Sequence, residues 1–431
     1  MKRRTFLKTS LAATVPWIVP ANVLGGRHTA PSDKILMGCI GVGGMGTGHV
    51  RSFLGYDDVH IVAVCDVRQS HRDRAKQLVD QAYNTSDCAT YNDFRDLLSR
   101  DDIDAVTNVT PDFWHVLIGL EAARRGKHMY YEKPLSRTIH ESQVMRDAIN
   151  EHDVVFQFGT QQRSDQRFRF ALELVINGYI GELNTVMIGS ADYAQIPRQP
   201  EQPVPAGFDY DMWLGPAPWA PHTYERCTRQ WTLLDDYSLG CISGAWGIHS
   251  VDMVQWVNRS DDAAPLSAEG TGSISEPGFY DTYNRFEIEH IYKNGLKLIH
   301  MDMNTAKKKA WQFELFHMAI LFLGSDGWIY VGRGFLDAEP KSLLRAQLGP
   351  NDTRLPVSND HRRNFLDCVK CRTTPISSID SAFYSDVTCH QAYIAAKLGR
   401  KVEWDNAREL FIQDEEANRM KTRAMRSPWH L

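Results

Sequence analysis

The sequence lacks long apolar runs and lacks an excess of positive charge. No uninterrupted stretch approaches the ~18–20 apolar residues that cross a bilayer, so no membrane anchor is predicted. The 48 Lys and Arg are outnumbered by 53 Asp and Glu, which gives a formal net charge of −5. That balance excludes the basic surface of a nucleic-acid-binding protein. With 431 residues, 43% of them hydrophobic, the chain predicts a soluble globular protein of two or three domains acting on small molecules.

Cysteine is sparse and shows no pattern typical of a metal centre. The even number of eight permits disulfides if the protein is exported. Cys39 and Cys65 fall in apolar runs, where a free thiol packs as a small hydrophobe. Cys368 and Cys371 have the spacing of a metal or redox pair, but no second pair or histidine cluster accompanies them. We therefore predict no metal site.

The first residues differ in character from the rest of the chain. Arg3-Arg4-Thr5-Phe6-Leu7-Lys8 precedes a mildly apolar stretch, Leu11 to Leu24, which prolines interrupt. A basic start with paired arginines, followed by a short apolar segment, is typical of a twin-arginine export signal. Residues 1–32 are therefore predicted to be a signal peptide that directs the protein to the periplasm or another exported location. A basic amphipathic arm is the alternative.

A glycine-rich segment follows the first apolar run, Lys34 to Ile40. It reads Gly41-Val42-Gly43-Gly44-Met45-Gly46 and leads into a helix-like segment. This strand–turn–helix context is the one in which G-x-G-x-x-G binds a dinucleotide pyrophosphate at a helix N-terminus. The first glycine permits the tight turn, the second the approach of the phosphates, and the third the packing of helix on strand.

An acid and a base follow the second predicted strand, His60 to Cys65. Asp66 lies 20 residues past Gly46. A carboxylate there accepts hydrogen bonds from the adenosine ribose and repels a 2′-phosphate, which favours NAD over NADP. The nearby Arg68 leaves NADP open.

Strands and helices continue to alternate up to residue 158. Helices are predicted at 91–100, 113–125 and 139–151, and strands at 103–109, 128–131 and 154–158. This alternation predicts a doubly wound parallel sheet, with residues 33–157 as the NAD-binding domain. Ligands of such sheets bind at the carboxyl ends of the strands. The polar and proline-containing segments at those ends are Asn108, Thr110 and Pro111, and Glu132, Lys133 and Pro134.

Several of these segments, in this order, resemble the Gfo/Idh/MocA oxidoreductases and in particular their exported bacterial branch. The residues that carry the resemblance are Gly41-x-Gly43-x-x-Gly46, Asp66, Thr110-Pro111-Asp112-x-Trp114-His115, Glu132-Lys133-Pro134, Gly159-Thr-Gln-Gln-Arg-Ser164, Trp213-Leu-Gly-Pro216, Trp246-Gly-Ile-His249, Asp252-x-x-Gln255-Trp256, Asn364-Phe-Leu-Asp-Cys368 and Glu416-Ala-Asn-Arg419. The likeness covers nearly the whole chain.

The resemblance implies two domains of the α/β class. A Rossmann domain with a doubly wound parallel sheet is expected to join a substrate-binding α/β domain, residues 158–405, with an open, largely antiparallel sheet that often mediates oligomers. We expect a homo-oligomer on that basis. Strand-like runs at 286–292, 296–303 and 328–331, with a hairpin turn at Gly295, agree with this domain independently. Residues 406–431 are predicted to be a tail that packs on the body.

The same resemblance implies the site residues. Lys133 would lie beside the substrate hydroxyl and the nicotinamide, and His249 would be the general base that removes the hydroxyl proton. The cofactor-binding residues implied are Gly41, Gly43, Gly44, Met45, Gly46, Asp66, Arg68, Asn108, Thr110, Pro111, His115, Glu132 and Lys133. The substrate-binding residues are Gln161, Arg163, Tyr193, Asp236, Tyr237, Trp246 and His249. Gln162 is expected near the same site.

One position departs from the family pattern. The dehydrogenases usually carry an Asp four residues before that His, whereas this chain has Ala245. A substrate-orienting carboxylate is therefore missing. Asp235, Asp236 or Tyr237 upstream, or Asp192 or Tyr193 after the predicted strand 185–189, are candidate substitutes, and solvated loop residues are the alternative for each.

The segment 193–237 is rich in Pro, Trp and Tyr, with Trp213, Trp219 and Trp231 among them. Aromatic faces stack on sugar rings, so a carbohydrate cleft is one interpretation and an extended loop packed on the domain is the other.

Three functions remain open. The first is an NAD-dependent oxidoreductase that acts on a hydroxyl of a sugar or glycoside with a tightly held cofactor, because an exported enzyme has no NAD pool to draw on. The second is a redox-neutral glycoside-cleaving enzyme on the same fold, which proceeds by transient ring oxidation, elimination, hydration and re-reduction. The third is a non-catalytic sugar- or NAD-binding protein.

Overall fold

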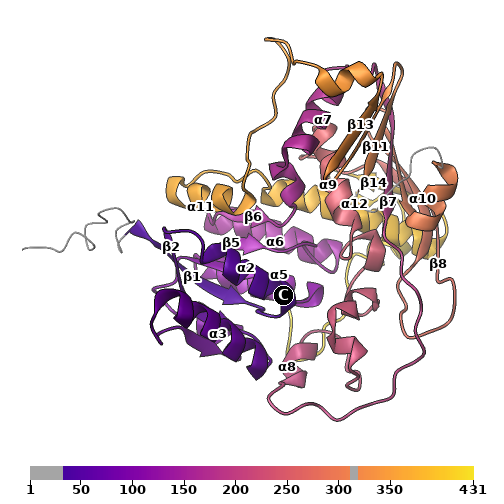
Figure 1. Cartoon of the computed structure of the whole chain (residues 1–431). Coiled ribbons are helices and arrows are strands. Elements are labelled where there is room, and N and C mark those ends of the chain that lie inside the picture. The colour runs from indigo at the N-terminus through magenta and orange to yellow at the C-terminus, as the bar shows by residue number, and fades with distance from the viewer. Residues whose placement is uncertain (1–32, 311–318) are drawn as a thin grey trace, which may run out of the picture.

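The fold was analysed on a computed structural model that describes residues 33–310 and 319–431. The predicted export signal, residues 1–32, lies outside the described residues. Within the described part, the strands form a parallel sheet of six strands and a mixed, mostly antiparallel sheet of nine (Figure 1). This confirms the α/β class with one doubly wound and one open sheet.

The first sheet has the strand order β3-β2-β1-β4-β5-β6, and its strands run parallel. The strands are β1 (Ile35–Ile40), β2 (Val59–Cys65), β3 (Ala89–Tyr91), β4 (Ala105–Asn108), β5 (His128–Tyr131) and β6 (Phe156–Phe158). Their residues are mainly apolar and buried because helices cover both faces of a parallel sheet. The order reverses beside β1, so the crevice for a ligand lies there.

Helices connect these strands. They are α2 (Gly44–Phe53), α3 (Gln69–Tyr83), α4 (Phe94–Leu98), α5 (Asp112–Arg124) and α6 (Ile139–His152). The helix predicted at 91–100 is wrong at its start, because Tyr91 ends strand β3 and the helix begins only at Phe94. The cause is local: the Asp93 carboxylate accepts a hydrogen bond from the Arg95 amide and caps the helix at that point.

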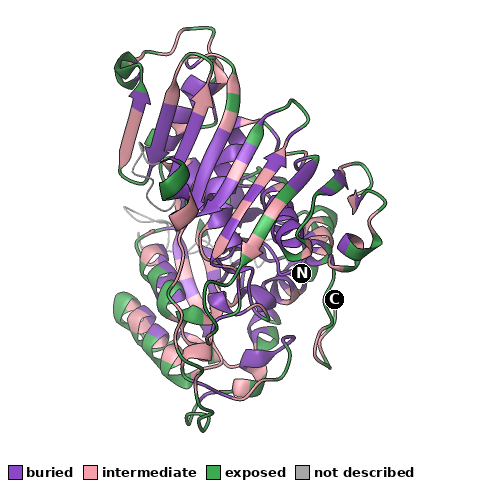
Figure 2. Cartoon of the chain, turned by 90° about the vertical axis from the view of Figure 1, so that its right-hand side faces the viewer, coloured by how far each residue is buried: buried purple, intermediate pink, exposed green. Residues whose placement is uncertain are grey.

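The second sheet has the order β13-β12-β11-β7-β10-β9-β8-β14-β15. Its strands are β7 (Leu183–Ser190), β8 (Ser267–Ser273), β9 (Arg285–Ile291), β10 (Lys297–Asp302), β11 (Ile320–Gly324), β12 (Trp328–Gly332), β13 (Phe335–Glu339), β14 (Val402–Asp405) and β15 (Leu410–Phe411). Only β7 and β10 pair in parallel. Figure 2 looks onto this sheet, where β9 alternates buried and half-buried residues as a one-sided sheet requires.

Three long helices cover the buried face of the second sheet. They are α7 (Gln166–Ile176), α9 (Gly247–Val257) and α12 (Ile379–Leu398), and α12 also packs on α6 of the Rossmann domain. The short α10 (Met303–Lys309) lies against β7, β9 and β10. Because α12 touches both domains, one continuous apolar core runs between them.

Helix α11 (His361–Cys371) belongs to the Rossmann core despite its late position in the chain. Its buried residues Phe365, Leu366 and Val369 share one apolar cluster with the first two strands. The predicted substrate-binding domain, residues 158–405, therefore does not form one separate body, because its residues 361–371 pack beside β5 of the Rossmann domain.

A long segment, residues 191–246, leaves β7 and crosses over to the Rossmann domain before it returns to α9; we call it the crossing segment. It contains the short helix α8 (Tyr210–Leu214), seen at the bottom of Figure 1, and three short 3-10 turns. The Phe208 ring lies 3.8 Å from the Arg68 guanidinium, and the Gln69 amide donates to the Gly207 carbonyl at 2.8 Å. These contacts hold the crossing segment on the ends of the Rossmann strands.

The last residues bind the crossing segment from outside. After α13 (Glu415–Arg419), the Arg426 guanidinium donates to the Gly215 carbonyl and to Asp211. The Trp429 ring lies 4.6 Å from the Trp114 ring, edge to face, and the Arg95 guanidinium stacks on it from the other side. The C-terminus therefore ends beside α5, at the centre of Figure 1.

Candidate active site

A cavity with a volume of about 1420 Å³ lies where the carboxyl ends of the Rossmann strands face the crossing segment. Residues of the glycine loop, of the β2, β4 and β5 ends and of the crossing segment line it together. Thirteen of the residues predicted from the sequence form its wall: Gly41, Gly43, Gly44, Met45, Gly46, Asp66, Arg68, Thr110, Pro111, Glu132, Lys133, Tyr193 and Trp246. The structure thus brings most of the predicted cofactor residues to one place.

The glycine loop fits a dinucleotide. Gly41 has φ of +78°, and a Cβ on Gly46 would lie 1.8 Å from the Gly41 carbonyl oxygen, so both positions require glycine. A Cβ on Gly44 would meet nothing within 4 Å, which leaves open space in front of the helix. No side chain of the described residues caps the start of α2. Free amides and an open approach at a helix N-terminus suit a pyrophosphate.

Asp66 and Arg68 face the same cavity in different ways. The Asp66 carboxylate accepts hydrogen bonds from the Arg68 amide and lies 3.2 Å from the His71 ring, which fixes it at the end of β2. The Arg68 guanidinium instead donates to the Cys227 carbonyl and stacks on Phe208. Arg68 is therefore engaged with the crossing segment, and Asp66 presents the charge that suits the ribose hydroxyls of NAD.

Asn108 and His115 do not line the cavity; they support the loop that does. The Asn108 amide donates to the His115 carbonyl, and its oxygen accepts from the Thr110 hydroxyl. The His115 ring contacts the carbonyls of Thr110 and Pro134 at 2.9 and 2.7 Å. Burial lowers the pKa of His115 to about 4, so the ring is neutral at physiological pH.

Glu132 reaches the cavity floor as a charged group. Burial alone would raise the pKa of this carboxyl, but the His49 ring, 2.9 Å away, and the charges of His49 and Lys133 lower it to about 2. Because the carboxylate is ionised and bound to His49 of helix α2, it ties the glycine-loop helix to the end of β5.

Lys133 lines the cavity, whereas His249 is buried outside its lining. The Lys133 ammonium donates to the Gly244 carbonyl at 2.7 Å and lines the cavity. His249, in the first turn of α9, is 4% exposed and does not line the cavity, although Gly244, Ala245 and Trp246 just before it in the chain do. Its Nδ1 has no hydrogen-bond partner among the described residues. Burial, together with the charge of Lys133, holds the pKa of His249 well below its usual value, so the ring is neutral.

The candidate substitutes for the missing carboxylate lie in different surroundings. Asp192 and Tyr193 line the cavity, but Asp192 pairs with Arg285 at 3.1 Å and the Tyr193 hydroxyl donates to the Thr282 carbonyl. Asp235 bonds to Tyr393 and Arg423, at the surface of α12.

Four predicted substrate contacts lie away from the cavity. Asp236 is exposed and points elsewhere, while Tyr237 is buried in an aromatic cluster with its hydroxyl bound to Arg226. Gln161 is exposed near Arg333, and its neighbour Gln162 is buried. Neither glutamine lines the cavity.

The fourth, Arg163, is a structural residue, which corrects its assignment to the substrate. It is 2% exposed, and its guanidinium donates to both oxygens of Asp252 and of Asp261 at 2.8 to 3.1 Å. A buried cation needs such compensation, and these two carboxylates supply it by joining η3 (Gln161–Ser164) to α9.

The aromatic residues of the crossing segment divide between the two interpretations. Trp213 lines the cavity, yet it is only 6% exposed and packs on Phe113 and Tyr237. Trp231 lines the cavity and is half-buried, and Trp219 is 68% exposed and lies outside it. Tyr224, 66% exposed at the rim, was not singled out from the sequence.

Sequence reasoning also missed a site role for Asp112. It is 2% exposed, lines the cavity and carries an oxygen without a hydrogen-bond partner in the described structure. Its place in the Thr110-Pro111-Asp112 segment was the available signal, but helix-starting acids are common on surfaces.

Residues 33–310 and 319–431 contain neither a metal-binding cluster nor a helix that could cross a membrane. No group of three or more His, Cys, Asp or Glu in these ranges could hold a metal ion, and no helix there is long and apolar enough to cross a membrane. All eight cysteines are free thiols.

A Rossmann domain whose glycine loop and ribose-facing acid open into a cavity under a second α/β domain defines a class, the two-domain NAD-binding oxidoreductases. Comparison with known families agrees. Residues 35–160 match "Oxidoreductase family, NAD-binding Rossmann fold", and residues 194–431 match "Oxidoreductase family, C-terminal alpha/beta domain". The chain belongs to this Gfo/Idh/MocA family, as the motifs predicted, and its cofactor is NAD.

Individual similar proteins share between 16% and 30% of their aligned residues with this chain. A Shewanella baltica protein called glycosyl hydrolase family 109 protein is 30% identical over 325 residues, covering 70% of this chain and 65% of the relative's own length. Among solved structures, an aldose-aldose oxidoreductase from Caulobacter crescentus superposes with a TM-score of 0.62 at 17% identity, covering 86% of this chain and 99% of that chain. The WlbA dehydrogenase from Bordetella pertussis, solved with NADH and UDP-GlcNAcA, gives 0.61 at 16% identity, with the same coverage. These structures show the shared fold.

Loss of the ion pairs of Arg163 should lower the stability of the protein and should leave the binding of substrate unchanged. Arg163→Met leaves Asp252 charged and buried without its partner, which should lower the free energy of unfolding by about 3–5 kcal/mol. Urea unfolding followed by fluorescence measures this. Arg163→Met combined with Asp252→Leu should recover most of the loss, and an unchanged stability of the single variant would show that the ion pair contributes nothing.

Removal of the Asp66 carboxylate should weaken the binding of NAD. Asp66→Ala removes the charged acceptor for the ribose hydroxyls, and a hydrogen bond to a charged group contributes ~1.5–3 kcal/mol, so NAD should bind roughly tenfold to a hundredfold more weakly. Fluorescence titration of the NAD-free protein measures the Kd. Asp87→Ala, an exposed acid of the same domain, is the control and should bind as the wild type does. Equal affinity of both variants would contradict the assignment.

Proposed function

We propose that this protein is an NAD-dependent oxidoreductase that acts on a hydroxyl of a sugar or glycoside and keeps its cofactor bound through turnover. The observation that carries the proposal is the cavity that brings the glycine loop, Asp66 and the Lys133 ammonium together. The charge of Lys133 also acts on the neutral, buried imidazole of His249. NAD, when bound, accepts a hydride from the substrate carbon.

Each of the two residues has a separate task in this proposal. Lys133 faces the cavity, so it holds the substrate hydroxyl oxygen and stabilises the negative charge that develops there. His249 is neutral and its Nδ1 has no hydrogen-bond partner among the described residues. Its role in this proposal is to take the hydroxyl proton when the substrate hydroxyl lies within hydrogen-bond reach of that nitrogen. A protonated imidazole could not accept that proton, and the lowered pKa of His249 keeps the ring in its neutral form, although it also makes the ring a weaker proton acceptor.

The substrate class follows from the rest of the wall. Beyond the cofactor residues, the wall carries hydrogen-bonding and aromatic side chains together, among them Tyr193, Arg229, Gln230, Trp231 and Tyr280. Hydroxyl-rich rings need both, because polar groups bind the hydroxyls and aromatic faces cover the C–H surfaces. The aldose-aldose oxidoreductase and the WlbA complex support a carbohydrate substrate by fold likeness alone.

Retention of the cofactor is supported by the crossing segment. It closes the cavity over the glycine loop and bonds to the ends of β2 and β3, where Asn92 donates to Asp209 at 2.8 Å. The tail bonds to the crossing segment through Arg426, and its Trp429 packs on Trp114 of α5. Retention agrees with the proposed export by the twin-arginine route, which carries folded proteins to a compartment without an NAD pool.

A second candidate is redox-neutral cleavage of a glycoside, and the glycosyl hydrolase family 109 relative favours it. In that reaction oxidation of a ring hydroxyl acidifies the neighbouring C–H, the C1 substituent leaves, water adds, and the hydride returns to the sugar. Both candidates share the first oxidation and hence Lys133 and His249.

The two candidates predict different products. Protein incubated with nitrophenyl glycosides should release nitrophenol without net NADH if it cleaves glycosides, and should accumulate NADH on free sugars if it is a dehydrogenase. His249→Ala should lose at least about 100-fold in kcat in either case, because a general base contributes 10²–10⁴-fold. It should keep NAD at wild-type affinity. Absence of dinucleotide from the purified protein, together with no affinity for added NAD, would refute both candidates.

The hydrogen bonds of the tail to the crossing segment should slow the dissociation of NAD. Arg426→Ala removes hydrogen bonds to Gly215 and Asp211, so the crossing segment should open more often and NAD should dissociate at least several-fold faster. Stopped-flow displacement of NAD measures the rate. Arg408→Ala, an exposed tail cation, is the matched control. Equal dissociation rates in the two variants would show that the tail does not retain the cofactor.

A further inference from the structure

Position 245 holds alanine, yet one carboxylate reaches the same wall from the other domain. Asp112 is the first residue of α5, on the Rossmann side, and lines the cavity with 2% exposure. Its Oδ2 is buried and forms no hydrogen bond of good geometry among the described residues, although the Ser238 hydroxyl is close enough to lower the pKa of the carboxyl. A buried carboxylate oxygen without a partner costs free energy, so its retention calls for an explanation.

Gly244 connects this carboxylate to Lys133. The Lys133 ammonium donates to the Gly244 carbonyl at 2.7 Å. A Cβ on Gly244 would lie 2.3 Å from Asp112 Oδ2 and 2.5 Å from the Ser238 hydroxyl, so any side chain there would displace the carboxylate. The cation and the carboxylate therefore both lie next to the same glycine.

Other carboxylates near the cavity are already paired. Glu132 is bound to His49, Asp66 to the Arg68 amide and His71, and Asp192 to Arg285. Asp112 is the carboxylate of the described wall that combines burial with an unpartnered oxygen.

The charges around Asp112 make its ionisation sensitive to Lys133. Burial raises the pKa of Asp112 to about 7, and the Lys133 charge is the largest influence that opposes this. The Ser238 hydroxyl and Arg137 also lower it, whereas Asp386 of α12 raises it. Tyr131 faces it from β5.

We propose that Asp112 is the carboxylate partner of Lys133 and takes the place of the acid that is missing at position 245. This rests on the proposed function of Lys133. Asp112 is a positioning residue: its negative charge holds the ammonium at the Gly244 carbonyl, so that Lys133 points into the cavity at the substrate hydroxyl. When Asp112 is protonated this restraint is lost, and activity should fall with it.

The coupling is tested first without turnover. Infrared spectra of protein labelled with ¹³C-carboxyl aspartate should contain a protonated-carboxyl band that disappears as pH rises through about 7. Asp112→Asn should remove that component. Lys133→Met removes the cation that lowers the pKa of Asp112, so the midpoint should move to higher pH. A midpoint unchanged by Lys133→Met would overturn the proposal.

Kinetics then test the positioning role. Asp112→Asn should lower kcat by about 100-fold, as small misplacements of catalytic groups do, with KM changed much less. It should also abolish the loss of activity below pH 7, a loss that His249 cannot cause because its pKa lies well below that range. Asp112→Glu should restore part of kcat. Asp147→Asn, an exposed acid on α6, is the control and should behave as the wild type does. A pH profile in Asp112→Asn like that of the wild type would overturn the proposal.

Misfolding is separated from loss of function by stability. Because the pKa of Asp112 is raised in the folded protein, ionising it costs stability as pH rises from the unfolded value toward about 7. Asp112→Asn has no such cost, so its Tm at pH 8 should equal or exceed that of the wild type. If the wild type turned over no sugar or glycoside, the proposed function would fail, while the infrared titration would still decide the pairing of Asp112 with Lys133.

Discussion

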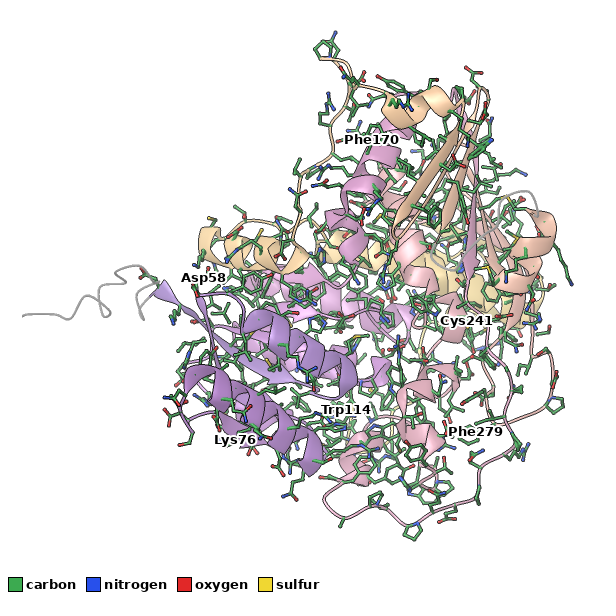
Figure 3. All side chains as sticks on the ribbon, viewed as in Figure 1. Asp58, Lys76, Trp114, Phe170, Cys241 and Phe279 are labelled. Atoms are coloured by element: carbon green, nitrogen blue, oxygen red, sulfur yellow. The ribbon has the colours of Figure 1, made fainter. Side chains whose placement is uncertain are left out.

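The packing of the crossing segment on helix α5 is the constraint on which the site depends. A Cβ on Gly215 would lie 2.1 Å from the Trp114 ring, so glycine is required where the two meet, and the Trp114 indole donates to the Met212 and Trp213 carbonyls. Figure 3 labels Trp114, which belongs to α5, and Cys241, which belongs to the crossing segment. Because this contact holds residues 191–246 beside the ends of the Rossmann strands, both parts of the chain line one cavity.

Burial at the site changes the pKa values of two of its groups. Inside the cavity wall, burial drives His249 toward its neutral form and Asp112 toward protonation, and it strengthens the attraction between Lys133 and its neighbours. Both shifts are caused mainly by burial and favour the neutral form of each group, and perturbed pKa values of this kind are frequent at catalytic sites. This weighs against the non-catalytic alternative.

Local patterns predicted the Rossmann half well. The glycine loop, Asp66 and the strand ends at Thr110 and Lys133 all lie in the cavity, because parallel strands place their carboxyl ends on one edge whatever the rest of the chain does. The same reasoning failed for Arg163 and Asp236. Side-chain direction in 3-10 turns and loops depends on partners far along the chain, such as Asp252 and Asp261 for Arg163, and no local pattern shows them.

The sequence by itself therefore determined the family, the NAD-binding loop and the absence of an acid at position 245. Only the tertiary structure decided what surrounds that position. Asp112 and Gly244 are 132 residues apart, and their contact exists because the crossing segment returns to α5 before it enters α9. The spacing of a motif shows which residues are close along the chain. Which charges compensate one another in a buried wall depends instead on which residues are close in space.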